Sequence, residues 1–246
     1  MSHQNSTISV NTIEPQSGTT LTIGNAGQDV VVNADSIKNN VWKDAGGNAL
    51  FTSNGSGALS GINSGFGSAE VLLATEIVST PVVQVDFTSG IDNTYPLYRW
   101  DFINIHPSSE EYWFRFQVNA VGESGFDEYI TSTLFTSRIG ENGAQAMLYY
   151  ADDDDQAQGT AYQAMSGPGA NRDFESASGY LYLANPSGTT YAKNFWGRQN
   201  SANWDSYTWN NYVAGYINTT AAIDEISFRM EGGNIDAGKI KMYGIK

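Results

Sequence analysis

The strongest constraint in this sequence is a period of two in its apolar residues between positions 83 and 242. Apolar residues recur at every second position in five runs: 83–87, 98–102, 112–119, 226–230 and 240–242. A β-strand points successive side chains to opposite faces of its sheet, so each run indicates a strand with one buried face. Turn-forming segments such as 185–188 and 231–234 separate these runs. We therefore predict that residues 69–246 form an antiparallel β-sandwich resembling a jelly roll.

The aromatic residues divide the chain into two regions, because 28 of the 31 Phe, Trp and Tyr residues follow residue 86. Residues 1–52 hold short β-branched runs and a Gly46-Gly47 turn between two β-prone arms, which predicts small strands and a hairpin. Such strands expose too few apolar residues to form a core, so we expect this region to assemble with other chains.

The segment 53–68 contains five Gly and five Ser, a composition typical of a flexible linker or an extended connector. We therefore predict three parts: an N-terminal β assembly region at 1–52, the linker at 53–68 and the sandwich at 69–246. The apolar run 71–78 is too short for its periodicity to decide between a helical turn and a strand.

Composition excludes several functions. Acidic residues outnumber basic residues by 26 to 12, and the resulting net charge of −14 disfavours binding to nucleic acid. The absence of Cys excludes thiol catalysis, cysteine zinc sites and disulfides. No apolar run reaches the ~18–20 residues of a membrane-spanning helix, and the first residues lack the basic and apolar regions of a signal peptide. We expect a protein without a cofactor that binds neither nucleic acid nor membrane.

Both ends of the chain carry a resemblance. Residues 7–24, TISVNTIEPQSGTTLTIG, resemble the N-terminal segment of virion structural and tail-fibre-like proteins of marine tailed bacteriophages. Residues 39–57, NNVWKDAGGNALFTSNGSG, are similar to the hairpin that follows it, and residues 220–246 are similar to closing strands of a β-sandwich common in that group.

The resemblance implies a structural protein of the virion surface, either a tail fibre or a capsid decoration, that is made in the host cytoplasm. It also implies a homotrimer. Because the strands of residues 1–52 lack a partner within the chain, we place the trimer contact and the attachment to other virion proteins there.

Clusters of acidic residues could in principle bind a metal ion or catalyse hydrolysis. The run Asp152–Asp155 suggests calcium, but adjacent carboxylates point in alternating directions, so we favour a solvated loop tip. The pair Asp224-Glu225 also faces opposite sides, whereas retaining glycosidases place two carboxyls about 5–5.5 Å apart. His106 is the only His of the predicted sandwich and there is no Gly-x-Ser-x-Gly motif. We expect neither catalytic residues nor a metal site, and a virion-borne polysaccharide hydrolase, built from acids distant in sequence, stays open as an alternative.

The best candidate for ligand binding is a group of eight rings between residues 191 and 216, which are mixed with amide side chains. Rings with polar neighbours suit the binding of host-surface carbohydrate, which leaves a free-standing glycan-binding lectin as a further alternative. The same rings also suit a sandwich core or a subunit contact. If Phe114 and Phe116 face inward, Trp113 and Arg115 share the outer face as a second glycan patch or a protein interface. The predicted ligand-binding residues are Trp196, Arg198, Trp204, Asp205, Tyr207, Trp209, Trp113 and Arg115.

Overall fold

The computed structural model describes residues 41–44, 46–53, 56, 59–60, 62, 69–167, 169, 171–172, 174–203 and 206–246. Every regular element in these ranges is a β-strand, and no helix there is long and apolar enough to cross a membrane. The chain divides into two compact units, residues 1–67 and 68–246. The predicted strands before residue 41 lie outside the described residues.

The first unit contains a three-stranded antiparallel sheet of β1 (Val41–Lys43), β2 (Ala49–Ser53) and β3 (Leu59–Ser60). Val41 pairs with Thr52, which confirms the predicted hairpin. In its turn, Asp44 Oδ1 accepts hydrogen bonds from the backbone amides of Gly46 (2.9 Å) and Asn48 (2.8 Å). Bonding to the side chain and backbone of Asn48 lowers the pKa of Asp44. β3 shows that part of the Gly/Ser-rich segment is extended and pairs with β2.

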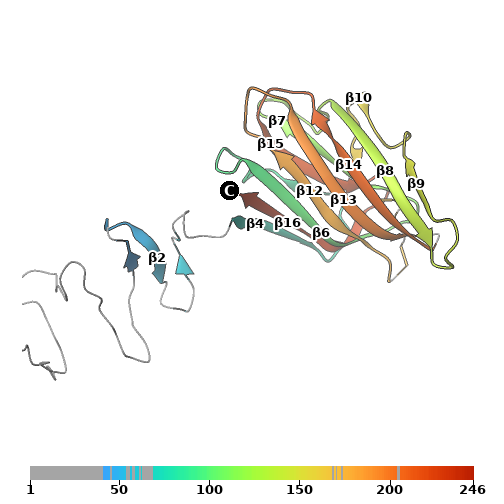
Figure 1. Cartoon of the computed structure of the whole chain (residues 1–246), viewed down its shortest axis with the longest axis horizontal. Coiled ribbons are helices and arrows are strands. Elements are labelled where there is room, and N and C mark those ends of the chain that lie inside the picture. The colour runs from blue at the N-terminus through green and yellow to red at the C-terminus, as the bar shows by residue number, and fades with distance from the viewer. Residues whose placement is uncertain are drawn as a thin grey trace, which may run out of the picture. The chain divides into compact units, whose positions relative to one another are not determined.

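The second unit is an antiparallel β-sandwich of two unequal sheets (Figure 1). The large sheet has the strand order β10-β8-β14-β13-β12-β6-β16-β4, with β9 also paired to β8. Its strands are β4 (Glu70–Val78), β6 (Leu97–Pro107), β8 (Ile130–Gly140), β9 (Met147–Tyr150), β10 (Ala157–Gly159), β12 (Ala177–Ala184), β13 (Lys193–Asn203), β14 (Tyr207–Ile217) and β16 (Ile235–Ile245). The small sheet has the order β11-β7-β15-β5, built from β5 (Gln84–Phe87), β7 (Phe114–Ala120), β11 (Gln163–Ala164) and β15 (Ile223–Met230).

These two sheets confirm the predicted all-β fold with an antiparallel sandwich. β4 covers the segment 71–78, so the alternative of a strand is correct there. β4 pairs along β16, which begins after the predicted turn at 231–234. The first and last strands of this unit are therefore neighbours in the large sheet.

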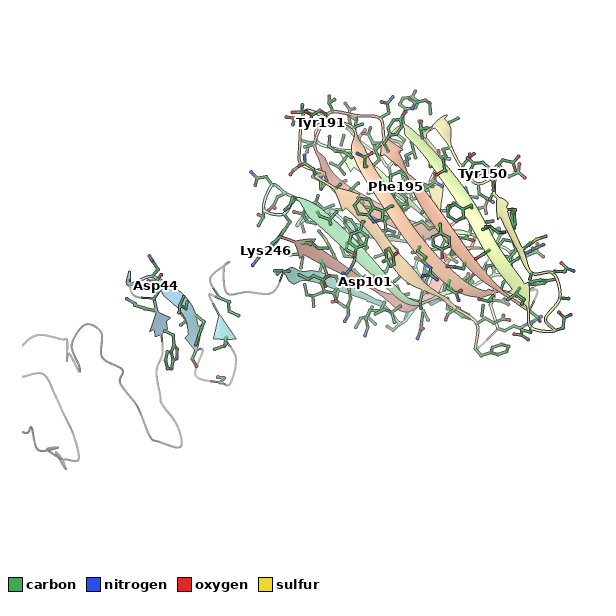
Figure 2. The ribbon with its side chains drawn as sticks, in the orientation of Figure 1. Asp44, Asp101, Tyr150, Tyr191, Phe195 and Lys246 are labelled. Carbon is green, nitrogen blue, oxygen red and sulfur yellow. The ribbon has the colours of Figure 1, made fainter. Side chains whose placement is uncertain are left out.

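The two sheets are joined by aromatic side chains that point inward from both of them. Phe228 of β15 lies at the centre, with 0% of its surface exposed, and its ring contacts Phe102 and Phe114 at centroid distances of 5.1 and 6.0 Å. Phe195 of β13, labelled in Figure 2, packs edge to face on Phe116 of β7 at 5.0 Å and makes a second ring contact between the two sheets. Edge-to-face aromatic pairs add about 0.5–1.5 kcal/mol each beyond the burial of their area.

The small sheet covers the inner face of the large sheet, and no described strand of this unit covers the opposite face. Figure 1 shows this face with β6, β12, β13, β14 and β8 side by side, and with β7 and β15 behind them. Every second residue of these strands therefore points to solvent. This outer face holds the candidate site described below.

The central position of Phe228 leads to a test of the packing. We expect Phe228→Ala to lower the free energy of unfolding by about 3–5 kcal/mol, because it leaves a cavity among four other rings. Chemical denaturation of the full chain measures this change. The matched control is Tyr191→Ala, whose side chain is 74% exposed and should change stability by less than about 0.5 kcal/mol. A loss below about 1 kcal/mol in Phe228→Ala would contradict the central role of this ring.

Candidate functional site

The group of rings between residues 191 and 216 is split between the two faces of the large sheet. On β13, Trp196 and Arg198 point outward, whereas Phe195 is buried in the core. On β14, Tyr212 points outward and Trp209 is buried, with 8% of its surface exposed. The interpretation as a core therefore holds for the inward members, and the outward members stay candidates for a ligand surface.

The outward residues join rings from neighbouring strands in stacked pairs. Tyr212 pairs in register with Phe135 of β8, and their rings stack at 4.8 Å with an interplanar angle of 10°. Trp196 pairs with Tyr182 of β12, and these rings stack at 5.2 Å and 15°. Six side chains form this surface, which we call the platform: Phe135, Tyr180, Tyr182, Trp196, Arg198 and Tyr212.

Arg198 and Tyr180 connect the two stacked pairs of the platform. The guanidinium carbon of Arg198 lies 5.2 Å from the ring centroid of Tyr212, on a neighbouring strand. Tyr180 is in register with Arg198 and contacts Tyr182 edge to face at 5.4 Å. The platform therefore extends without interruption over β8, β14, β13 and β12, and its rings are held in position by one another before any ligand arrives.

Amide and hydroxyl side chains adjoin the platform on one side. Asn210 accepts a hydrogen bond from Arg198 Nε (2.9 Å) and donates one to the hydroxyl of Tyr212 (3.0 Å). Thr208 donates to Asn200 Oδ1 at 2.9 Å. Together with Ser137, these residues line a shallow depression of about 300 Å³. Such groups can both donate to and accept from ligand hydroxyls.

A larger depression of about 440 Å³ lies on the other side of Trp196. Its lining includes Trp196, Tyr216, Asn194 and Thr133. Ala214 stands opposite Trp196 in the sheet, and its small side chain leaves the ring edge uncovered. Trp196 remains 40% exposed and Tyr216 36% exposed, so two rings border this depression.

Arg99 extends the ring and guanidinium surface toward the other edge of the sheet. Its guanidinium group binds Glu70 through two hydrogen bonds (2.6 and 2.9 Å) and lies 2.8 Å from Asp101. The hydrogen bonds that Arg99 donates to Glu70 raise the pKa of Arg99 most. Burial opposes this increase, and Tyr182 and Asp101 add to it. The guanidinium carbon also lies 4.8 Å from the ring centroid of Tyr243. These contacts fix Arg99 beside Tyr182.

Three of the predicted ligand-binding residues belong to an inner aromatic cluster instead. Trp209 contacts Trp113 edge to face at 6.2 Å, and Arg138 lies over the rings of Trp209 and Tyr207 at 4.9 and 5.1 Å. Trp113 therefore does not share an outer face with Arg115, as the alternation suggested, because β7 begins only at Phe114. These rings support the end of the sandwich and do not face solvent as a group.

The remaining predicted residues lie apart from the platform. Arg115 is on β7 of the small sheet, where its Nη2 atom forms an ion pair with Glu231 at 2.7 Å. Trp204 and Asp205 lie outside the described residues. Of the eight predicted residues, only Trp196 and Arg198 are part of the platform.

The acidic run is less uniformly solvated than predicted. Asp152 and Asp153 are exposed, but Asp154 is partly buried, and burial raises its pKa to about 6. The charge of Arg115 opposes this increase, and the charge of Glu231 adds to it. Asp155 accepts a short hydrogen bond from the hydroxyl of Tyr150. Among the residues that the structure describes, no group of three or more His, Asp or Glu side chains is placed to hold a metal ion.

Comparisons with protein-family models, with curated proteins and with solved structures found no match.

The raised pKa of Asp154 leads to a prediction of pH dependence. A carboxyl with a folded-state pKa of about 6, against 3.8 as its usual value, binds more protons in the folded than in the unfolded state between these values. Its contribution to stability is therefore present below about pH 4 and is lost as the pH rises to 6. We expect Asp154→Asn to raise the free energy of unfolding at pH 7 by about 1 kcal/mol, since solvent screens part of the effect of burial on this pKa.

Denaturation curves between pH 4 and pH 7 measure this effect. Asp152→Asn is the matched control, because Asp152 is an exposed member of the same run. Equal stability of Asp154→Asn and the unchanged protein at pH 7 would show that the folded structure does not disfavour the charged form of Asp154.

Proposed function

We propose that this protein is a non-enzymatic structural protein on the surface of a tailed bacteriophage particle, and that the outer face of its large sheet binds glycan on the host surface. The resemblance of residues 7–24, 39–57 and 220–246 supports the first part. The second part depends on one observation: the platform is a preformed, solvent-facing surface of stacked rings bordered by amides.

Sugars have an apolar face of C–H groups and a rim of hydroxyls. The C–H face packs on an aromatic ring, and amides fix the hydroxyls through hydrogen bonds. In the platform, Tyr182 holds the indole of Trp196 in a stacked geometry, so little side-chain entropy is lost on binding. The two depressions beside the platform add space for neighbouring sugar units of a polymer.

Binding fits this surface better than hydrolysis. A glycosidase of the common type needs two carboxyl groups on either side of the scissile bond. Among the described residues, neither the platform nor the lining of its two depressions includes Asp or Glu. Release of reducing sugar from host polysaccharide tests the alternative of a hydrolase directly.

Trp196→Ala tests the proposed binding surface. We expect the full chain to bind host-surface polysaccharide on a glycan array, and the variant to bind about 10-fold more weakly, equivalent to about 1.4 kcal/mol of lost stacking. Trp196→Phe keeps a ring and should retain most of the affinity. Tyr191→Ala is the matched control, because Tyr191 is exposed outside the platform. Unchanged affinity of Trp196→Ala for a bound glycan would contradict the assignment of the site.

The proposed homotrimer has a separate test in light scattering. We expect the full chain to have about three times the 26.7 kDa mass of one chain. Removal of residues 1–52 should give monomers, because we place the trimer contact there. A monomeric full-length protein would contradict the trimer and leave the binding surface unaffected.

A further inference from the structure

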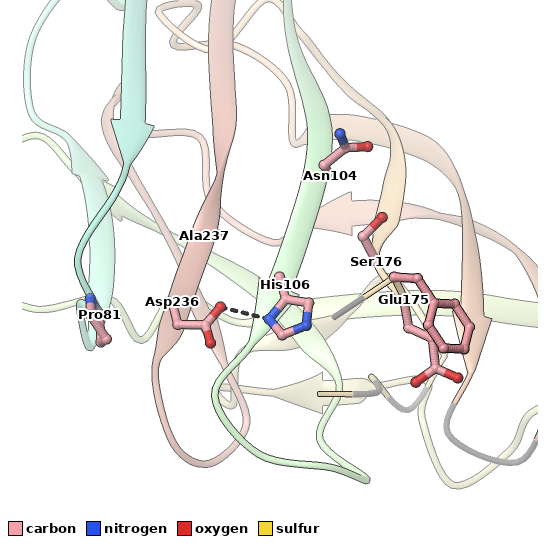
Figure 3. A pocket seen from close by; sticks show the side chains of 8 residues that line it. Pro81, Asn104, His106, Glu175, Ser176, Asp236 and Ala237 are labelled. Atoms are coloured by element: carbon pink, nitrogen blue, oxygen red, sulfur yellow. Dashed lines mark hydrogen bonds and ion pairs between the residues drawn. The ribbon is translucent and has the colours of Figure 1, made fainter. Parts of the chain in front are cut away.

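A further pocket, separate from the platform and its two depressions, lies where the ends of β6, β12 and β16 meet. It has a volume of about 740 Å³. Asn104 and His106 of β6, Asp236 of β16, and Phe174 and Glu175 before β12 line it (Figure 3). These residues are far apart in the sequence, and the register of the large sheet brings them together.

Irregular backbone forms the wall of this pocket. Asn104 has a positive φ of 51°, and the pairing of β6 with both neighbours shifts register close to it. Gly238 of β16 has a φ of 137°, and a Cβ atom there would lie 2.9 Å from the carbonyl oxygen of Asn104. Bulges of this kind redirect side chains and are common beside functional sites.

His106 fixes one carboxylate of the pocket. Its Nδ1 atom lies 2.6 Å from Asp236 Oδ1, and its Nε2 atom lies 3.1 Å from the carbonyl oxygen of Arg172. Both ring nitrogens therefore have partners already. The ring positions Asp236 and offers neither a free base nor a free metal-binding nitrogen.

Glu175 is a second carboxylate in the pocket wall, and one of its two oxygens lacks a hydrogen bond. The residue is only 3% exposed, and its Oε1 atom lies 3.5 Å from Arg172 Nη1. Its Oε2 atom has no hydrogen-bond partner in the part of the chain that the structure describes. A buried carboxylate oxygen without a donor destabilises the folded state, because it has lost its hydrogen bonds to water. Because Oε2 is itself closed to solvent, a hydroxyl in the pocket supplies the missing donor only when the Glu175 side chain turns toward it.

The surroundings indicate which chemistry the donor has. Arg172 Nη1 lies 3.5 Å from Glu175 and His106 Nδ1 lies 2.6 Å from Asp236, so each carboxylate has one partner and can accept further hydrogen bonds. Phe174 adds an apolar ring that is 76% exposed. Hydroxyl donors and an apolar face occur together in a sugar.

We propose that this pocket binds a single neutral sugar residue, whose hydroxyls donate to Glu175 and Asp236 while its apolar face packs on Phe174. The inference rests on the proposed function in one respect, since the sugar would be a terminal unit of the same class of host glycan. It uses none of the platform residues. The two sites can therefore be lost separately.

Saturation-transfer NMR and calorimetry on the full chain test the pocket, with the methyl glycosides of glucose, galactose and mannose as probes. We expect at least one of them to bind, and to bind about 10-fold more weakly to Glu175→Gln and to Phe174→Ala. Phe174→Ala alters an exposed side chain, so a folding defect would not explain its loss. Tyr191→Ala is the matched control, because Tyr191 is exposed and lies outside both the platform and the pocket, and it should bind the monosaccharide as the unchanged protein does.

Three results would overturn this proposal: no glycoside binds, both pocket variants bind as the unchanged protein does, or the diamine putrescine binds more tightly than every glycoside. None of these results affects the platform, whose polymer binding is measured with Trp196→Ala. Conversely, polymer binding that does not depend on Trp196, together with monosaccharide binding that depends on Glu175, would contradict the proposed platform site and support the proposed pocket site.

Discussion

The packing of rings between two unequal sheets is the contact on which the rest of this structure depends. Phe228 of the small sheet meets Phe102 of the large sheet at 5.1 Å, and further rings from both sheets surround this pair. Among the described residues there is no disulfide that could replace this contact, and no group of three or more side chains is placed to bind a metal ion. Aromatic burial joins the sheets, and the strand period of two then decides which side chains are left outside.

The candidate site is a consequence of this arrangement. Every second residue of β13 points into the core, as Phe195 does. The residues between them, such as Trp196 and Arg198, therefore face outward. The small sheet covers only the inner face, so it leaves Trp196 and Arg198 uncovered. Rings of neighbouring strands then stack on one another, as Tyr182 and Trp196 do. The resulting surface is apolar and also rigid, which favours a ligand with a flat C–H face.

Much of the fold follows from the sequence, because period two and turn residues act locally. The hairpin around Gly46-Gly47 and the strands at 98–102 and 226–230 lie where they are expected. Polar residues on the inner face show the limit of this pattern. Asn211 is fully buried and accepts a hydrogen bond from Thr136, although its residue type alone suggests an outward position.

The platform could be predicted only in part, because it depends on register between strands that are distant in the sequence. Phe135 and Tyr212 stack although they are 77 positions apart in the sequence. No local pattern specifies that β8 and β14 are neighbours. On β14 both alternating sets contain rings, so the sequence does not decide which set faces inward. The pocket at Glu175 depends on bulges in β6 and β16, which periodicity does not predict.

The most direct test of the central claim is an NMR titration of the indole N–H signals with the glycan that binds most tightly on the array. The outward Trp196 and the buried Trp100 and Trp209 give internal comparison within one protein. If the outer face of the large sheet binds carbohydrate, the Trp196 signal shifts in a saturable manner and the signals of Trp100 and Trp209 remain in place. Saturable binding that leaves the Trp196 signal unchanged would contradict this account.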